Sequence, residues 1–429
     1  MSAVAHPAVV FNCGYNGLSI IQDLGRRGVP CVAMDTSRSI GTYSRYARYV
    51  RCPDPSVDEK GFVEFLHAHC SGYPLKPVLF PTNDHYAMAV TRHKRRLEEV
   101  SIPCVGDWEA VRLVIDKDRF YALGQERGYR TPRTYSLDEL GTLPDGAFPL
   151  AAKPKHRRVS ADAGEDTFHK EMDRLRLTVI DDRSALEAFL AREARWLPHL
   201  VFQEYVPGLS NSMYTVGVYA APGGEVRARF SGRKVRGYPA DIGDCVVGGN
   251  ASVPDHVLDE VDRVVRELGL SGILEFEYKR HDATGELVLI EVNPRSWSWV
   301  GITSHAGADL PWTAYLDLTG RAADLPAPGP QPADGAVRYA KVVQDAINSL
   351  FRYGDDHPAW RRGPVAWWRE LHGPGRVVKA EFQGDDPLVA ARALVDGAKL
   401  LARWALGRAR RRTDAPRSAP GAALDGGRA

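Results

Sequence analysis

The first 35 residues of the chain alternate short apolar runs with a glycine-containing turn and an amphipathic stretch. Residues 8–11 are apolar, Gly14 to Gly17 form a turn, residues 18–27 have helical spacing, and a second apolar run ends at Asp35. Strands joined by a helix pair in parallel, because the helix carries the chain back to the same end of the sheet. The segments "PVLFPTND" and "HYAMAVTRHKRRLEE" repeat the pattern. The sequence therefore predicts a doubly wound α/β unit over residues 1–110, with a ligand crevice at the carboxyl ends of its strands.

From about Val111 onwards the pattern changes to antiparallel strands with helices on one side. This predicts an α+β unit over 111–320, with lobes at 111–202 and 203–320. After Gly320 a segment rich in Pro and Ala leads into an expected helical extension over 321–410. Residues 411–429 are expected to be a disordered tail.

The composition excludes several classes of protein. A chain of 429 residues is too long for one ordinary domain. Its 56 basic and 54 acidic side chains leave a formal charge of +2, which gives no reason to expect nucleic acid as a partner. Six cysteines without a C-x-x-C pair predict neither a disulfide framework nor a zinc site, so reduced thiols and a cytoplasmic location are expected.

The two ends of the sequence show no membrane span. No basic leader precedes the first apolar run, so no secretion signal is expected. The late apolar stretch over 388–407 is interrupted by Arg392, Asp396, Lys399 and Arg403, which are too polar for an ordinary span. Contact with a membrane is expected only through the basic helix that ends in "RWALGRARRR". The alternative, which we favour, is a core-packing helix with a solvated basic tail.

A predicted hairpin brings two carboxylates together. The strands "GILEFEYKR" and "ELVLIEVN" flank "HDATG", a short loop that places Asp282 opposite Glu286. Counting back along the two strands places Glu277 opposite Glu291, about 5 Å apart and on the same face as Asn293. Like charges directly opposite are unfavourable unless a cation lies between them.

Hard oxygen ligands at this spacing suit Mg²⁺, which one or two carboxylates hold and which substrate phosphates and water complete. Arg295 follows the strand end, where its charge would neutralise a developing negative charge. The alternative is a surface hairpin whose acids are solvated and paired with Lys279 and Arg280.

Four more basic residues and one strand edge point towards a nucleotide. Lys117 in "DKDRF" and Lys153 in "AAKPKH" are typical point-charge partners of phosphate, although single lysines mean little alone. Arg233 and Lys234 lie on a predicted strand that faces the same cleft. The strand "FQEYVPG" changes direction at Pro207, and its edge would offer backbone N–H and C=O groups to an adenine ring.

The order of these motifs resembles the ATP-grasp superfamily and, within it, the carboxylate-amine ligases with D-aspartate ligase-like members. After the parallel opening come "DK", "KP", "QEYVPG", "GRKVRGYP", "LEFEYK" and "IEVNPR", and the resemblance covers residues 8–320. Each motif alone is common, whereas the ordered set is specific. The resemblance implies a Rossmann-like N-terminal domain followed by a two-lobed ATP-grasp domain. It also implies a ligase that activates a carboxylate as an acyl phosphate and couples it to an amine.

The resemblance further implies ATP and Mg²⁺, or Mn²⁺, as cofactors. Lys117 and Lys153 would grip the nucleotide phosphates, Arg295 would stabilise the acyl phosphate, and Lys234, with Arg233, would lie near the γ-phosphate. The metal ligands would be Glu277, Glu291 and Asn293. The adenine and ribose contacts would come from Gln203, Glu204, Tyr205, Val206 and Ser210.

Two features depart from the family pattern. The loop over 154–168, where a lid would close over the reactive intermediate, is basic through Lys155, His156, Arg157 and Arg158. This loop either touches an anionic substrate or is simply solvated. Where an acidic residue often holds the ribose, the chain has "LSNS", so Ser210 or the following asparagine would serve.

Three other functions stay open. An NAD(P)-dependent oxidoreductase would use Gly14, Gly17 and Asp35, although "CGYNG" is an incomplete dinucleotide fingerprint. A kinase that phosphorylates a polyol on the same scaffold is the second alternative, and a protein that binds the nucleotide without turnover is the third. For the ligase, the expected partners are a small-molecule carboxylate and an amine, read by loops around Asp84, 238–249 and 297–305. The resemblance is also compatible with a homodimer.

Overall fold

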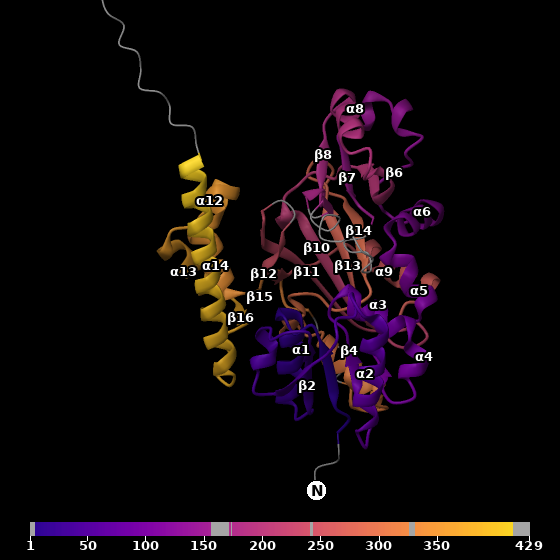
Figure 1. Cartoon of the computed structure of the whole chain (residues 1–429), viewed down its shortest axis with the longest axis vertical. Helices are drawn as coiled ribbons and strands as arrows, with labels where there is room; N and C mark the ends of the chain where they lie inside the picture. Colours follow the sequence, from indigo (N-terminus) through magenta and orange to yellow (C-terminus); the bar gives the residue numbers. More distant parts are fainter. Residues whose placement is uncertain (1–4, 156–170, 173, 241–242, 326–330, 415–429) are drawn as a thin grey trace, which may run out of the picture.

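The computed structural model describes residues 5–155, 171–172, 174–240, 243–325 and 331–414. The strands of this part form three sheets, and Figure 1 shows the N-terminal sheet at the bottom, a small lobe at the top and a long C-terminal helix at one flank. Apart from residues 154–155, the predicted lid loop lies outside the described residues. The predicted tail lies outside them beyond Asp414.

Five parallel strands form the N-terminal sheet in the order β3-β2-β1-β4-β5, which confirms the doubly wound prediction. Strand β1 has β2 on one side and β4 on the other, so the ligand crevice of this sheet lies at the carboxyl ends of β1 and β4. Helix α1 follows β1 directly, and helix α3 follows β4. The elements are β1 (Ala8–Phe11), α1 (Tyr15–Arg26), β2 (Cys31–Asp35), β3 (Ala47–Arg51), α2 (Glu59–Ser71), β4 (Val78–Phe80), α3 (Asp84–Arg92), α4 (Lys94–Leu97) and β5 (Ile102–Pro103).

A seven-stranded sheet in the order β14-β13-β10-β11-β12-β15-β16 forms the centre of the molecule. Its neighbouring strands are antiparallel except β15 and β16, which are parallel. Helix α9 (Asp255–Leu268) buries valines at positions 257, 261, 264 and 265 against this sheet, because that spacing places them on one helical face. The strands are β10 (Met213–Ala220), β11 (Val226–Tyr238), β12 (Asp244–Asn250), β13 (Gly272–Arg280), β14 (Leu287–Asn293), β15 (Val337–Ala340) and β16 (Arg376–Lys379).

The small lobe is a four-stranded sheet in the order β6-β9-β7-β8. Strand β9 crosses the proposed boundary between 202 and 203 and pairs with β6 and β7, so it belongs to this lobe as a whole. Phe202 of β9 packs against Phe189 in the core of the lobe. The elements leading into and forming the lobe are α5 (Trp108–Ile115), α6 (Lys117–Arg127), β6 (Thr134–Tyr135), β7 (Leu150–Pro154), β8 (Thr178–Ile180), α8 (Arg183–Arg192) and β9 (Leu200–Glu204).

The segment after residue 320 is not purely helical, which corrects the expected helical extension. Two of its strands, β15 and β16, continue the central sheet. Residues 411–414, expected to be in a disordered tail, continue helix α14 instead. Helix α10 (Leu310–Leu318) ends just before this segment. The α-helices described within the segment are α11 (Val342–Ile347), α12 (Tyr353–Asp356), α13 (Pro364–Leu371) and α14 (Pro387–Asp414).

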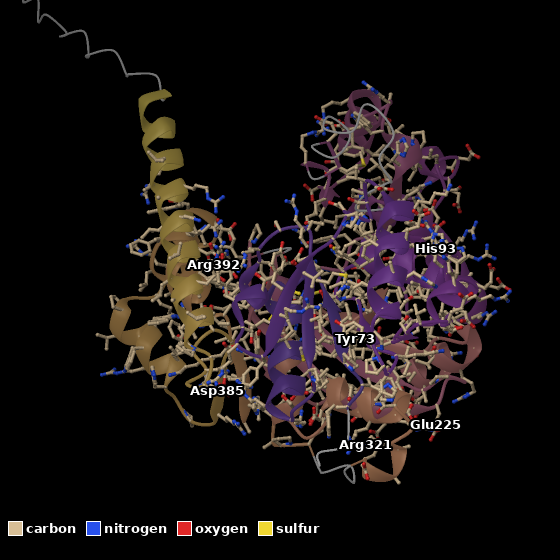
Figure 2. All side chains as sticks on the ribbon, turned by 60° about the horizontal axis from the view of Figure 1, so that its bottom comes forward. Tyr73, His93, Glu225, Arg321, Asp385 and Arg392 are labelled. Atoms are coloured by element: carbon tan, nitrogen blue, oxygen red, sulfur yellow. The ribbon has the colours of Figure 1, made fainter. Side chains whose placement is uncertain are left out.

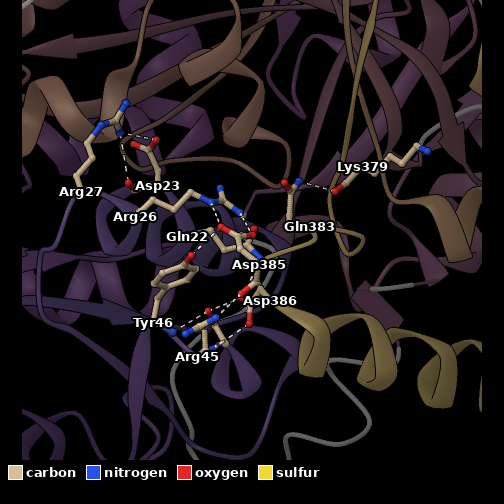
Figure 3. Close-up of polar contacts among 11 residues, drawn as sticks. Gln22, Asp23, Arg26, Arg27, Arg45, Tyr46, Lys379, Gln383, Asp385 and Asp386 are labelled. Atoms are coloured by element: carbon tan, nitrogen blue, oxygen red, sulfur yellow. Dashed lines mark hydrogen bonds and ion pairs between the residues drawn. The ribbon is translucent and has the colours of Figure 1, made fainter.

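Two consecutive aspartates attach the start of α14 to the N-terminal unit (Figure 3). The buried Asp386 carboxylate accepts hydrogen bonds from Gln22 Nε2 at 3.0 Å and from Ser44 Oγ at 2.6 Å. Asp385 accepts from Arg26 Nε at 2.7 Å and from the Tyr46 hydroxyl at 2.6 Å. Residues more than 300 positions apart in the sequence are therefore fixed against each other.

Helix α14 leaves an apolar surface exposed beyond these contacts. Arg392 donates to the Tyr43 hydroxyl at 2.8 Å, and Figure 2 shows Arg392 on α14 and Asp385 in the segment just before the helix. No helix in the described part of the chain is long and apolar enough to cross a membrane. Lipid contact by α14 and a homodimer stay predictions. The exposed apolar side chains of α14 include Leu388, Leu394, Val395 and Leu406.

Candidate active site

The hairpin of β13 and β14 brings the two predicted carboxylates face to face. Glu277 pairs with Glu291, as predicted. The predicted pairing of Asp282 with Glu286 is wrong, because His281 N donates to Glu286 O at 2.8 Å instead. An irregularity after Glu277 shifts the register by one residue and restores the predicted pairing at the glutamates.

Each of these glutamates has a lysine beside it. Lys234 Nζ of β11 lies 2.8 Å from Glu277 Oε1, and Lys117 Nζ at the start of α6 lies 3.3 Å from Glu291 Oε1. Burial by itself lowers the pKa of Lys234, but the neighbouring Glu277 carboxylate outweighs this effect and raises the pKa above its usual value. Lys234 is therefore held as a cation beside Glu277.

A third acid, Glu275, belongs to the same site and was not predicted. It pairs with Asn293 across the hairpin, and its carboxylate accepts from Asn293 Nδ2 at 3.0 Å and from Thr215 Oγ1 at 3.2 Å. Burial, followed by the charge of Glu277, raises the pKa of Glu275 to about 8. The period of two along "LEFEY" places Glu275 on the face of Glu277, so the signal was present in the sequence.

Arg295 joins the hairpin to the N-terminal unit. Its Nε donates to Asp84 Oδ1 at 2.6 Å, its Nη2 to Asn293 Oδ1 at 3.1 Å and its Nη1 to the Ser296 carbonyl at 3.0 Å. Burial lowers the pKa of Arg295, but Asp84, and after it Glu275, raise the pKa above its ordinary value. Asp84, expected in a loop that reads substrate, thus holds the guanidinium in place.

A second polar contact makes the same connection. Asn16 Nδ2 donates to the carbonyls of Thr82 and Ser296, each at 2.8 Å, and the Ser296 hydroxyl donates to Asn16 Oδ1 at 2.7 Å. The loop after β14 is therefore fixed against the crevice of the N-terminal sheet.

The three glutamates of this site, together with Asn16, Thr82 and Asp84, line a cavity of about 760 Å³ between the N-terminal unit and the central sheet. Its walls also include Trp297 and Trp299, which are almost completely buried. The predicted site residues that line it are Lys117, Lys234, Glu277, Glu291, Asn293 and Arg295.

The other predicted site residues are not among those that line this cavity. Lys153 Nζ donates to the Tyr121 hydroxyl at 2.6 Å. That hydroxyl donates to the carbonyl of Ile290, which precedes Glu291. Arg233 is exposed and neighbours Lys234 on β11, so the alternation of the strand turns it away from the cavity.

The predicted adenine and ribose residues lie at and beyond the end of β9. Gln203 is buried, its Nε2 donates to Thr134 Oγ1 at 2.8 Å, and strands β6 and β7 flank its backbone. Glu204 is exposed, Tyr205 is half-buried, and its N–H donates to the Pro149 carbonyl at 3.1 Å. Val206 and Ser210 are buried.

The donor set around the hairpin fits Mg²⁺. Two opposed carboxylates and an amide oxygen are hard ligands, and the two lysines beside the acids show that this position favours positive charge. No group of three or more His, Cys, Asp and Glu residues within the described ranges is arranged to hold a metal ion alone. A cation at the hairpin would thus take further ligands from a substrate and from water.

No protein-family model matches the chain. A curated relative, D-aspartate ligase of Enterococcus faecium, is 25% identical over 235 residues, which are 51% of this chain and 53% of that protein. The chain thus spans about half the length of this relative.

Solved structures resemble the chain over a larger share. Biotin carboxylase from Campylobacter jejuni in complex with β,γ-ATP covers 75% of this chain and 72% of its own, with a TM-score of 0.55 and 12% identity. An L-amino acid ligase from Bacillus licheniformis covers 75% and 77%, with a TM-score of 0.54 and 15% identity. N5-carboxyaminoimidazole synthetase from Staphylococcus aureus, complexed with ADP, covers 76% and 80%, with a TM-score of 0.54 and 15% identity. The comparisons support the resemblance to carboxylate-amine ligases, and the chain shares the fold of these three proteins, with the predicted Rossmann-like domain followed by a two-lobed domain.

Proposed function

We propose that the protein is an ATP- and Mg²⁺-dependent ligase that joins a carboxylic acid to an amine. The observation that carries the proposal is the opposed pair Glu277 and Glu291, flanked by Lys117, Lys234 and Arg295 in one cavity. The likeness in sequence to a D-aspartate ligase and in fold to an L-amino acid ligase supports it.

The acids of the hairpin would hold the cation of the nucleotide. Glu277, Glu291 and Asn293 supply its oxygen ligands, and Mn²⁺ suits the same donors. The bound ion would neutralise phosphate oxygens, which phosphoryl transfer needs more than covalent help. We assign Lys117 and Lys234, which lie beside the acids, to binding of the phosphates.

Arg295 would stabilise the acyl phosphate and the tetrahedral state that follows it. Its three hydrogen bonds to Asp84, Asn293 and Ser296 fix the guanidinium before the reaction. A preorganised cation in a buried site stabilises developing charge strongly, because it does not need to reorient. The amine then displaces phosphate and forms the amide.

The nucleotide base would lie beside the segment after β9. Glu204, Tyr205 and Val206 follow the strand end and are proposed to contact the adenine. Gln203 and Ser210 are buried, so we assign them to positioning this segment. Lys153, tied through Tyr121 to the residue before Glu291, is proposed to serve the nucleotide phosphates together with Lys117.

The oxidoreductase alternative gains no support from the first βαβ unit. Asp35, the acid that would bind a ribose there, already accepts from Cys13 N, Thr36 N and Ser39 Oγ at 2.8, 2.8 and 2.7 Å. Its carboxylate is used to hold the turns around it.

The test is release of ADP and phosphate from Mg·ATP with a panel of amino acids, singly and in pairs, with mass detection of products. The ligase predicts turnover that needs an acid and an amine together and a product lighter than their sum by one water. A phosphate ester as the product would instead identify a kinase. Tight binding of Mg·ATP without turnover for any acid or amine would identify a binding protein.

A further inference from the structure

One lysine in the cavity has no acidic partner within the part of the chain that the structure describes. Among the described residues, seven lysine and arginine side chains line the cavity. Six of them have a carboxylate oxygen within 4.0 Å, and Lys341 is the exception. The six paired residues are Arg92, Lys117, Lys155, Arg176, Lys234 and Arg295.

The central sheet carries Lys341 into this position. It follows β15 directly, its backbone N–H donates to the Val246 carbonyl at 3.0 Å, and only 5% of the residue is exposed. Its Nζ lies 5.2 Å from the centroid of the Tyr15 ring. The hydroxyl of Tyr15 donates to Glu381 at 2.8 Å, and Glu381 also accepts from the Val342 N–H at 2.9 Å.

The charged surroundings of Lys341 do not compensate its burial. Burial lowers the pKa of Lys341, and Cys245, Asp244 and Glu381 counteract this effect without cancelling it, while Lys234 adds to it. A buried ammonium without a partner is costly, and an anion entering the cavity would relieve that cost.

The start of α1 lies at the same end of the cavity. Gly14, Tyr15 and Asn16 line the wall, and no side chain caps the first turn of this twelve-residue helix. The first N–H groups of a helix lack partners within the helix and attract anions. A Cβ built on Gly14 meets no atom within 4 Å, so there is open space in front of the turn.

We propose that Lys341 and the N-terminus of α1 together bind a non-reacting carboxylate group of a substrate. At least one substrate is then an amino acid or a dicarboxylic acid, and its free carboxylate lies between Lys341 and Tyr15. The assignment of this group to a ligase substrate rests on the proposed function. The binding of a carboxylate at Lys341 does not depend on it. The group is assigned to a substrate rather than to ATP, because the Lys341 ammonium faces the Tyr15 ring of the N-terminal unit, whereas Lys117, a proposed phosphate ligand, lies at the start of α6.

The test compares amino acids with their carboxamides, which keep the side chain and amine but lose the negative charge. The protein with Mg·ATP is titrated calorimetrically with each member of the pair, in the natural sequence, Lys341→Met, Lys341→Arg and Lys379→Met. Lys379 provides the matched control, because it lies in the same segment but does not line the cavity. Unfolding temperatures confirm that each variant is folded.

We expect the natural protein to bind at least one amino acid about tenfold or more tightly than its carboxamide. Lys341→Met should remove that preference, Lys341→Arg should retain part of it, and Lys379→Met should leave it unchanged. If the protein catalyses ligation, the KM of the Lys341→Met variant is measured for the acid and for the amine. The substrate whose KM rises is the one that carries the non-reacting carboxylate. A raised KM for ATP alone would assign Lys341 to the phosphates and overturn the proposal.

Equal binding of acid and carboxamide by the natural protein would also overturn it, whether or not the ligase reaction is confirmed with another pair of substrates. Conversely, an amino acid that binds through Lys341 without amide formation would leave this site standing while the proposed function fails.

Discussion

Glu277 and Glu291 are directly opposed across β13 and β14, and separate elements supply a lysine to each. Lys234 lies on β11 of the same sheet, and Lys117 is the first residue of α6. Two like charges in a buried hairpin are unfavourable, so the arrangement favours a cation at this point. A metal ion bound with the nucleotide would neutralise the two glutamates in place of the lysines. The lysines would then be available to bind the phosphates.

Replacing either glutamate by glutamine should abolish turnover without unfolding the protein. We expect Glu277→Gln and Glu291→Gln to lower kcat by about 100-fold or more, because the amide oxygen carries no charge for the metal. The free energy of unfolding should fall without the protein unfolding, because each substitution leaves a largely buried lysine without the carboxylate that it pairs with. ADP release measured against Mg²⁺ concentration checks the first point, and urea unfolding checks the second.

The exposed Glu286 on the same hairpin is the matched control. Glu286→Gln should keep the kcat of the natural protein. A near-normal rate in Glu277→Gln or Glu291→Gln would contradict the metal assignment.

Arg295 should not be replaceable by lysine. The guanidinium donates in three directions, to Asp84, Asn293 and the Ser296 carbonyl, and one ammonium group cannot reproduce that planar geometry. We expect Arg295→Lys to lower kcat by about 100-fold with little change in the KM for ATP. Arg321→Lys, which alters an exposed pair with Asp324, is the control and should have no effect. A rise in the KM for ATP with unchanged kcat would assign Arg295 to nucleotide binding instead.

The sequence predicted local pairings well and contacts between distant segments poorly. The pairing of Glu277 with Glu291 followed from the hairpin loop and the period of a strand, both local rules. Although the register near the loop was wrong by one residue, the irregularity after Glu277 compensated for it. The contact between Asp84 and Arg295 joins residues 211 positions apart, and no periodicity reports such a contact.

The same reason explains the missed strands of the C-terminal segment. Strands β15 and β16 have four residues each, and their partners lie in β12 and in each other. Short apolar runs of this length do not distinguish a strand from a helix. Lys341, at the end of β15, could therefore not be placed in the cavity from the sequence.

Two glycines of the central sheet should tolerate no side chain, because the tryptophans of the cavity wall lie against them. A Cβ on Gly217 would overlap the indole of Trp297, and a Cβ on Gly248 would overlap that of Trp299. We expect Gly217→Ala and Gly248→Ala to lower the free energy of unfolding by about 1–3 kcal/mol and to shift the tryptophan fluorescence. Gly141→Ala is the control, since a Cβ there meets no atom within 4 Å. Unchanged fluorescence in both variants would show that the indoles do not depend on these glycines.

A buried carboxyl pair should make stability fall as pH rises. Arg27 lies 2.5 Å from Asp23 and 2.5 Å from Asp309, yet Asp23 Oδ2 and Asp309 Oδ1 have no hydrogen-bond partner among the described residues. Burial, followed by the charge of Asp309, raises the pKa of Asp23 to about 8. The folded chain therefore retains a proton that the unfolded chain releases near pH 4.

Between these two pKa values the folded state binds more protons than the unfolded state, so the free energy of unfolding decreases as pH rises from about 4 towards 8. An asparagine at position 23 does not titrate, and we expect Asp23→Asn to lose less stability than the natural protein over this range. Urea unfolding at pH 5 and pH 8 measures the difference for each protein. Asp324→Asn, at a half-exposed ion pair, is the control. Its free energy of unfolding should change with pH as it does in the natural protein. If the free energy of unfolding of Asp23→Asn also showed the natural dependence on pH, the carboxyl pair would not be the group that retains the proton.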